Sequence, residues 1–177
     1  MYTRFVHLLN ALQSPFALLV RVYVSWVFLK SGWLKLEDWG QTLSLFESEY
    51  RVPLLPPHAA AVVGTAGELV FSVLVIVGFA GRLSAIGLFA VNALAVISYA
   101  HVLFQEGSAA GLGQHYLWGF MLLVIVIYGP GALSIDGPLA RRSATSRAIL
   151  INGAQAREQH VTNDNKAQTR RRAARRS

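Results

Sequence analysis

The sequence contains no cysteine. This absence excludes dithiol exchange, thiolate metal sites and cysteine-ligated iron–sulfur clusters within the chain. It also means that cysteine usage does not indicate an oxidising or a reducing compartment. Charged residues are also few, at 14%, whereas 54% of the residues are hydrophobic and the mean hydropathy is +0.43. A soluble domain carries about 25% charged residues, so the composition indicates a membrane protein.

The hydrophobic residues come in four blocks of the length that a transmembrane helix needs, roughly 20 residues. Backbone N–H and C=O groups in lipid must be satisfied within the chain, which favours helices. The predicted fold is therefore all-α, an integral membrane four-helix transmembrane bundle within residues 1–140. Its spans are expected at about residues 16–36, 58–80, 83–104 and 115–133.

The basic charge is confined to the end of the chain. Residues 137–177 hold ten Lys and Arg against two acids, a net charge of +8, whereas the first 136 residues carry −1. Residues 141–177 are expected to form a basic, disordered cytoplasmic tail that interacts with anionic lipid. Nucleic acid is not an expected partner, because the tail has no aromatic residues and no nucleic-acid-binding motif.

One acid, Glu68, interrupts the apolar run from His58 to Gly81. It falls near the middle of the predicted second span, where an unpaired carboxylate costs several kcal/mol. Glu68 is expected to be either a neutral acid hydrogen-bonded to another helix or a carboxylate paired with a cation. Intramembrane acids of this kind mark a functional site by default.

Two basic residues of the first span are candidate partners for Glu68. Arg21, Ser25, Phe28, Gly32 and Lys35 follow each other at helical spacing, so they share one face of the predicted helix. Ser25 and Gly32 are small enough to let helices approach closely, which places this face inward. Both Arg21 and Lys35 can reach toward Glu68, and the sequence leaves the choice open.

Two histidines fall at one face of the predicted membrane domain. The third span places Gly87, Leu94 and His101 along one side, with Asn92 facing the other way. His115 opens the fourth span and is interpreted as an interfacial hydrogen-bonding residue. Two histidines without a carboxylate are a weak metal signal, so no metal site is predicted. Arg21, Lys35, Glu68 and His101 form the candidate polar pocket.

The distribution of Lys and Arg predicts the orientation in the membrane. Arg4, Arg82 and the basic tail fall on one side, whereas Lys35 and Arg51 on the other side are diluted by acids. Both termini are therefore expected in the cytoplasm. The stripe Trp39, Leu43, Phe46, Tyr50 between the first two spans suits a short interfacial helix, with a plain loop as the alternative.

Several segments together resemble the DoxX family of small four-helix bacterial membrane proteins. They are Arg21 in the first span, FLKSGWLKL (28–36), RVPLLPP (51–57), mid-span Glu68, GFAGR (78–82), His101 and GPGALSIDGPL (129–139). The resemblance covers roughly residues 16–140. It implies a multi-pass protein of the bacterial cytoplasmic (inner) membrane.

The resemblance also implies a range of functions. Some DoxX-like proteins are membrane subunits of thiosulfate:quinone oxidoreductases, and others are linked to thiol and superoxide defence complexes. We expect a membrane subunit of a quinone-linked oxidoreductase system, with the candidate polar pocket binding quinone and no covalently bound cofactor. The chain encodes no redox centre, so electrons require a partner redox subunit or a diffusing donor. The alternative is a non-enzymatic scaffold or a small proton-coupled carrier; whether the chain is an enzyme, and whether it forms a homo-oligomer, stay open.

Overall fold

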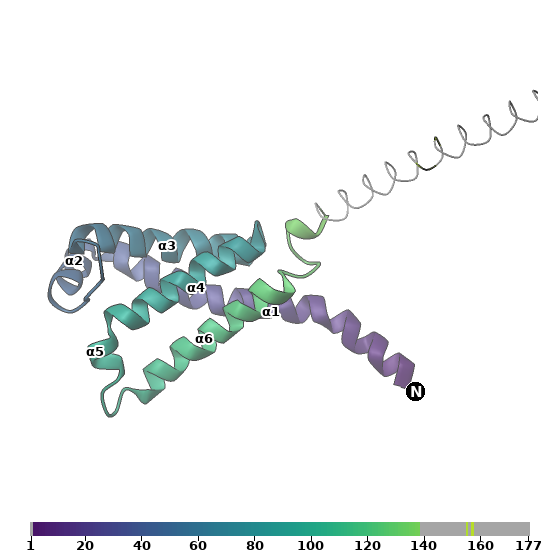
Figure 1. Ribbon diagram of the computed structural model, residues 1–177, viewed down its shortest axis with the longest axis horizontal. Helices are drawn as coiled ribbons and strands as arrows, with labels where there is room; N and C mark the ends of the chain where they lie inside the picture. The colour runs from purple at the N-terminus through teal and green to yellow at the C-terminus, as the bar shows by residue number, and fades with distance from the viewer. Residues whose placement is uncertain (1, 139–154, 156, 158–177) are drawn as a thin grey trace, which may run out of the picture. The chain divides into compact units, whose positions relative to one another are not determined.

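The computed structural model of the protein describes residues 2–138, 155 and 157. Residues Met1–Gly137 form one compact unit. The regular secondary structure among its described residues is helical, with no strand. The helices are α1 (Tyr2–Glu37), α2 (Trp39–Ser48), α3 (Pro57–Val77), α4 (Gly81–Ser98), α5 (Ala100–Leu103) and α6 (Ala109–Tyr128) (Figure 1).

Four of these helices, α1, α3, α4 and α6, are long and apolar enough to cross a membrane. The prediction of an all-α transmembrane four-helix bundle is therefore confirmed. Large apolar side chains point outward from all four helices, among them Trp26, Val70, Ile86 and Phe120. Such exposure is unfavourable in water and normal against lipid tails.

The helix ends differ from the predicted spans at several places. Helix α1 begins at Tyr2 and continues through Pro15, far upstream of the predicted span start at residue 16. The predicted third span, 83–104, is divided between α4 and the short α5. Helix α6 ends at Tyr128 because Gly129 adopts a positive φ of 88° and Pro130 follows, and neither continues a helix. The predicted tail, residues 141–177, lies outside the described residues apart from 155 and 157.

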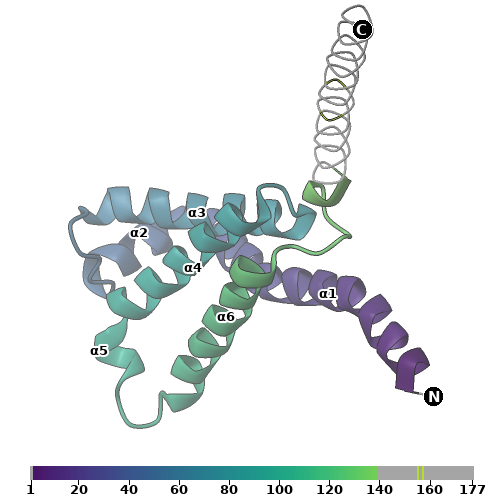
Figure 2. The same cartoon turned by 45° about the vertical axis from the view of Figure 1, so that its right-hand side comes forward.

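Helices α1, α3, α4 and α6 pack side by side, with α1 along α3 and α4 between α3 and α6 (Figure 2). Small residues allow close approach: Gly32 of α1 lies against Leu69 and Glu68, and Gly87 of α4 lies under the ring of Phe71. Helix α2 lies across the start of α3, where Phe46 packs on Ala60 and Ala61. The main core consists of Val24, Phe28, Val75, Ala85, Leu88, Leu122 and Ile125.

The predicted inward face of α1 is confirmed, since Arg21, Ser25, Phe28 and Gly32 are all buried. The third span is predicted to carry Leu94 on one side and Asn92 on the other, and the structure shows which side is packed. Asn92 is buried and Leu94 is exposed. Helix α4 contacts α3 and α6.

The segment that follows α6 closes one end of the bundle. The Asp136 carboxylate accepts hydrogen bonds from the backbone N–H groups of Ala80, at 3.0 Å, and Gly81, at 2.7 Å. The backbone N–H of Asp136 donates to the carbonyl of Gly78 at 3.1 Å. Buried Arg21 donates to the carbonyl of Leu133. Because the first N–H groups of a helix have no partner within it, Asp136 supplies the N-terminal cap of α4.

Candidate functional site

An ion pair joins α1 to α3 inside the bundle. Lys35 Nζ lies 2.6 Å from both carboxylate oxygens of Glu68 and 3.0 Å from Ser31 Oγ, one turn earlier on α1. The side chains retain 19% and 11% of their exposure, respectively. The three ammonium hydrogens of Lys35 thus have three acceptor atoms, and Lys35, not Arg21, is the cation that meets Glu68.

A cavity of about 360 Å³ opens beside this pair, and we call it the ion-pair cavity. This volume lies within the range of about 300–1,000 Å³ that small-molecule sites occupy. Its wall is mostly apolar and aromatic, with a few polar groups. The lining comprises Val27, Phe28, Ser31, Lys35, Phe46, Tyr50, Val52, Leu55, Ala60, Val63, Gly64, Glu68, Val91, Leu94, Ala95, Ser98, Tyr99, His115 and Trp118.

His115, on α6, brings a second polar group to the ion-pair cavity. Its Nδ1 lies 2.8 Å from Oδ1 of buried Asn92, while Nδ2 of Asn92 donates to the backbone carbonyl of His115 at 3.0 Å. An amide oxygen only accepts, so the neutral imidazole carries its proton on Nδ1 and leaves Nε2 as an acceptor. Asn92 therefore fixes both the orientation and the tautomer of His115.

Aromatic rings cover the cavity on two sides. Trp118 meets Phe28 and His115 edge to face, with ring centroids 5.6 Å and 5.0 Å away. Tyr50 lies between Phe46 and Tyr99, at 4.8 Å and 5.2 Å. Burial is the main cause that raises the pKa of Tyr50. The nearby Tyr99, Glu68 and Glu49 raise this pKa further. Tyr50 therefore stays a neutral phenol, able to donate a hydrogen bond, at physiological pH.

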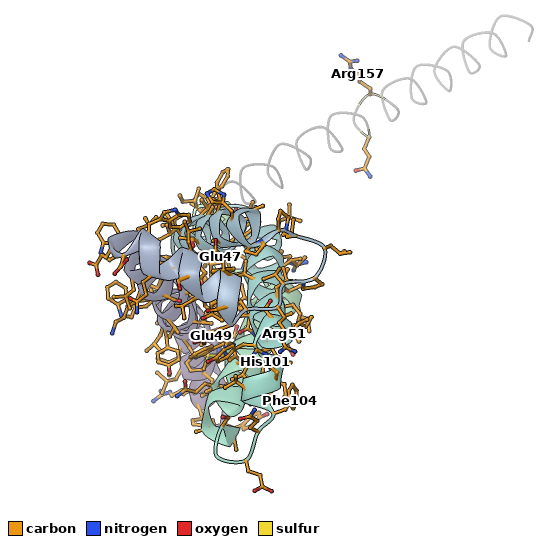
Figure 3. The ribbon with its side chains drawn as sticks, turned by 90° about the vertical axis from the view of Figure 1, so that its left-hand side faces the viewer. Glu47, Glu49, Arg51, His101, Phe104 and Arg157 are labelled. Carbon is orange, nitrogen blue, oxygen red and sulfur yellow. The ribbon has the colours of Figure 1, made fainter. Side chains whose placement is uncertain are left out.

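The structure separates the four residues of the predicted polar pocket. Lys35 and Glu68 lie together in the ion-pair cavity. Arg21 lies four turns from Lys35 along α1 and binds the segment after α6. His101 is exposed on α5, and its ring meets the ring of Tyr99 edge to face, with the ring centroids 5.6 Å apart. His101 is not part of the cavity lining. Figure 3 views this end of the bundle, with His101 near Arg51 and Glu49.

Sequence reasoning did not select Ser31, Tyr50, His115 or Trp118 for the site. His115 and Trp118 are three residues apart, so they share a helix face, and this spacing was a usable signal. Nothing local connects them to Glu68, because they meet only through helix packing. Among the described residues, no three His, Asp or Glu side chains gather closely enough to hold a metal ion.

The ion-pair cavity can bind a flat, polar-edged molecule with an apolar body. Glu68 and His115 Nε2 accept hydrogen bonds, Ser31 and Tyr50 donate them, and the aromatic walls cover apolar surface. Carboxylate and imidazole groups can also take up and release protons. The site therefore combines recognition of a ring with two proton-exchanging groups.

Comparison with protein families gives one match. The family model DoxX matches residues 16–102, which include most of α1, all of α2, α3 and α4, and the start of α5. No curated protein and no solved structure was found to match the chain. The matched residues contain Lys35 and Glu68, whereas His115 and Trp118 lie beyond them.

Proposed function

Because residues 16–102 match the DoxX family model, we propose that this chain is a DoxX-family membrane subunit of a quinone-linked oxidoreductase system and binds the quinone head group in the ion-pair cavity. The observation that supports this best is the composition of the cavity wall. Donors and acceptors stand among aromatic side chains between membrane-spanning helices. A lipid-soluble quinone has a planar ring with an oxygen at each end, which this wall complements.

The polar groups of the cavity wall have two different roles in this proposal, as donors and as acceptors of hydrogen bonds. The Tyr50 hydroxyl donates a hydrogen bond to a quinone carbonyl, whereas Glu68 and His115 Nε2 accept one from a quinol hydroxyl. Reduction of a quinone consumes two electrons and two protons. Glu68 and Nε2 of His115 take up protons from water and pass them to the quinone oxygens, and the electrons come from a partner redox subunit or a diffusing donor.

The proposal predicts that quinone binding depends on His115 and not on His101. Replacing His115 with phenylalanine removes one hydrogen bond and should weaken quinone binding roughly 5- to 10-fold, the equivalent of about 1 to 1.5 kcal/mol. The exposed His101→Phe variant, a change of the same chemistry outside the cavity, should bind like the parent. The measurements are the quinone extracted per purified protein and quenching of tryptophan fluorescence by a short-chain quinone.

Two results would contradict this proposal. One is parent protein that neither carries quinone from the membrane nor binds the short-chain analogue. The other is equal binding by the parent and His115→Phe variants, which would move any quinone site away from the ion-pair cavity.

The Lys35–Glu68 pair also supports a second candidate function, a small proton-coupled carrier. An ion pair within membrane helices is typical of proton relays in transporters. In that case purified protein carries no quinone, and the Glu68→Gln variant loses uptake driven by a pH gradient in proteoliposomes.

We propose further that the protein resides in the bacterial cytoplasmic membrane with both termini in the cytoplasm. Arg4 and Arg82 then lie on the cytoplasmic side, as the positive-inside rule requires. Reporter fusions at Ser108, between α5 and α6, and after Leu139 should report opposite sides of the membrane. Reports from the same side would contradict this orientation.

A further inference from the structure

The first part of α1 extends beyond the other helices (Figures 1 and 2). Helix α1 has 36 residues and is about 54 Å long at roughly 1.5 Å per residue, whereas the hydrocarbon core of a bilayer is about 30 Å thick. Gly131 lies against Ala17, and Arg21 is the first buried residue of α1. Residues Tyr2–Ser14, which we call the α1 extension, are therefore surplus to a transmembrane span.

The α1 extension has two chemically different faces. One face carries large apolar side chains spaced alternately by three and four residues, and they are 47% to 79% exposed. The opposite face is polar. The apolar face consists of Tyr2, Phe5, Leu9 and Leu12, joined by Leu8 at its edge, and the polar face consists of Thr3, His7, Asn10 and Ser14.

The apolar face of the α1 extension is continuous with the face that α1 turns to lipid. The same spacing continues through Phe16, Leu19, Tyr23 and Trp26, all at least 50% exposed. If the helix bends toward lipid where it leaves the bundle, its lipid-facing side becomes its underside. The apolar side chains of the extension then point into the bilayer, and the polar ones point to water. Pro15 lies at this junction, where it removes one backbone hydrogen bond and eases bending.

The charge of the segment favours a negatively charged membrane surface. No acid occurs between Met1 and Leu36, whereas Arg4 and His7 lie in the extension. Arg4 lies beside Leu8 at the edge of the apolar face. Its charged group can therefore reach the headgroups while its methylene groups stay in contact with apolar surface. A basic residue at such a surface is attracted by anionic lipid.

We propose that the α1 extension is an amphipathic helix that lies in the headgroup region of a bilayer containing anionic lipid. The side chains of its apolar face contact the outer ends of the lipid acyl chains, and Arg4 contacts lipid phosphate. A second copy of the chain is the competing occupant, because alternate spacing by three and four residues also suits a coiled coil. Lipid is the better occupant, since the same stripe continues onto the lipid-facing side of the span and is rich in aromatic residues.

The cysteine-free chain allows a direct test with single-cysteine variants of the full protein. Leu9→Cys and the adjacent Asn10→Cys, one on each face, are spin-labelled and reconstituted in vesicles of phosphatidylcholine and phosphatidylglycerol. Accessibility to oxygen relative to a water-soluble nickel chelate measures depth. The depth parameter should be positive at Leu9 and negative at Asn10. Omitting phosphatidylglycerol, or adding Arg4→Gln, should lower the value at Leu9.

Four results would overturn the proposal. Water exposure at both positions would show a helix projecting into solvent, and protection from nickel at both would show insertion. Spin–spin broadening at Leu9 between labelled copies would identify a second chain as the occupant. A depth at Leu9 that does not depend on phosphatidylglycerol would remove the role of anionic lipid.

Discussion

Replacing Glu68 with glutamine should lower the free energy of unfolding by about 3 kcal/mol, because it leaves the Lys35 ammonium within the bundle without its counter-ion. Lys35 would keep only one of its present side-chain acceptors, Ser31 Oγ at 3.0 Å, in addition to the neutral amide oxygen. The side chains of the pair are only 19% and 11% exposed, so water can replace the lost carboxylate only in part. Denaturant titration of the purified protein in detergent measures the change.

A double-mutant cycle identifies this loss with the ion pair. Lys35→Gln combined with Glu68→Gln should recover most of the stability, because the uncompensated charge is gone. Lys30→Gln is the matched control, since Lys30 is exposed on the same helix and should neither destabilise the protein nor couple to Glu68. If Glu68→Gln unfolds like the parent, or couples equally to Lys30, Glu68 is a neutral acid and the polar part of the ion-pair cavity carries no charge pair.

The second large effect is expected at the other end of the bundle. Asp136→Ala should cost about 3 to 5 kcal/mol, because it removes two hydrogen bonds to a charged acceptor, each contributing about 1.5 to 3 kcal/mol. The two N–H groups at the start of α4 would lose their cap, at distances now of 3.0 Å and 2.7 Å. Asp136 also interacts electrostatically with Arg21, which is 1% exposed, so the variant leaves a buried cation whose hydrogen-bond partner within the described part of the chain is the carbonyl of Leu133.

Asp38→Ala provides the comparison for Asp136→Ala. Asp38 also caps a helix, α2, but through one hydrogen bond, from Gln41 N at 2.9 Å, at an exposed position. Its removal should cost about 1 kcal/mol, the usual value for an N-cap. Arg21→Met combined with Asp136→Ala should be less harmful than the sum of the two changes, if the charges interact. Equal losses for Asp136→Ala and Asp38→Ala, with no coupling to Arg21, would mean that Asp136 acts as an ordinary cap.

The helical membrane fold and the buried face of α1 were both predictable from local patterns in the sequence. Both depend on local composition and spacing: long apolar blocks must form helices in lipid, and residues three or four apart share a helix face. Arg21, Ser25 and Gly32 are buried for this reason, as predicted. The sequence also predicted that Glu68 has a polar or charged partner, because a single acid in an apolar run needs one.

Which side chains meet across the bundle depends on how the helices pack. The sequence allowed either Arg21 or Lys35 as the partner of Glu68, and Lys35 is the partner because α1 and α3 are antiparallel and Gly32 lets them approach at the level of Glu68. His115 enters the cavity and His101 does not, because α4 ends at Ser98 and α6 lies beside it, where Asn92 holds the imidazole. These contacts join residues 23 to 33 positions apart. They depend on the rotation and offset of whole helices, which periodicity within one helix does not determine.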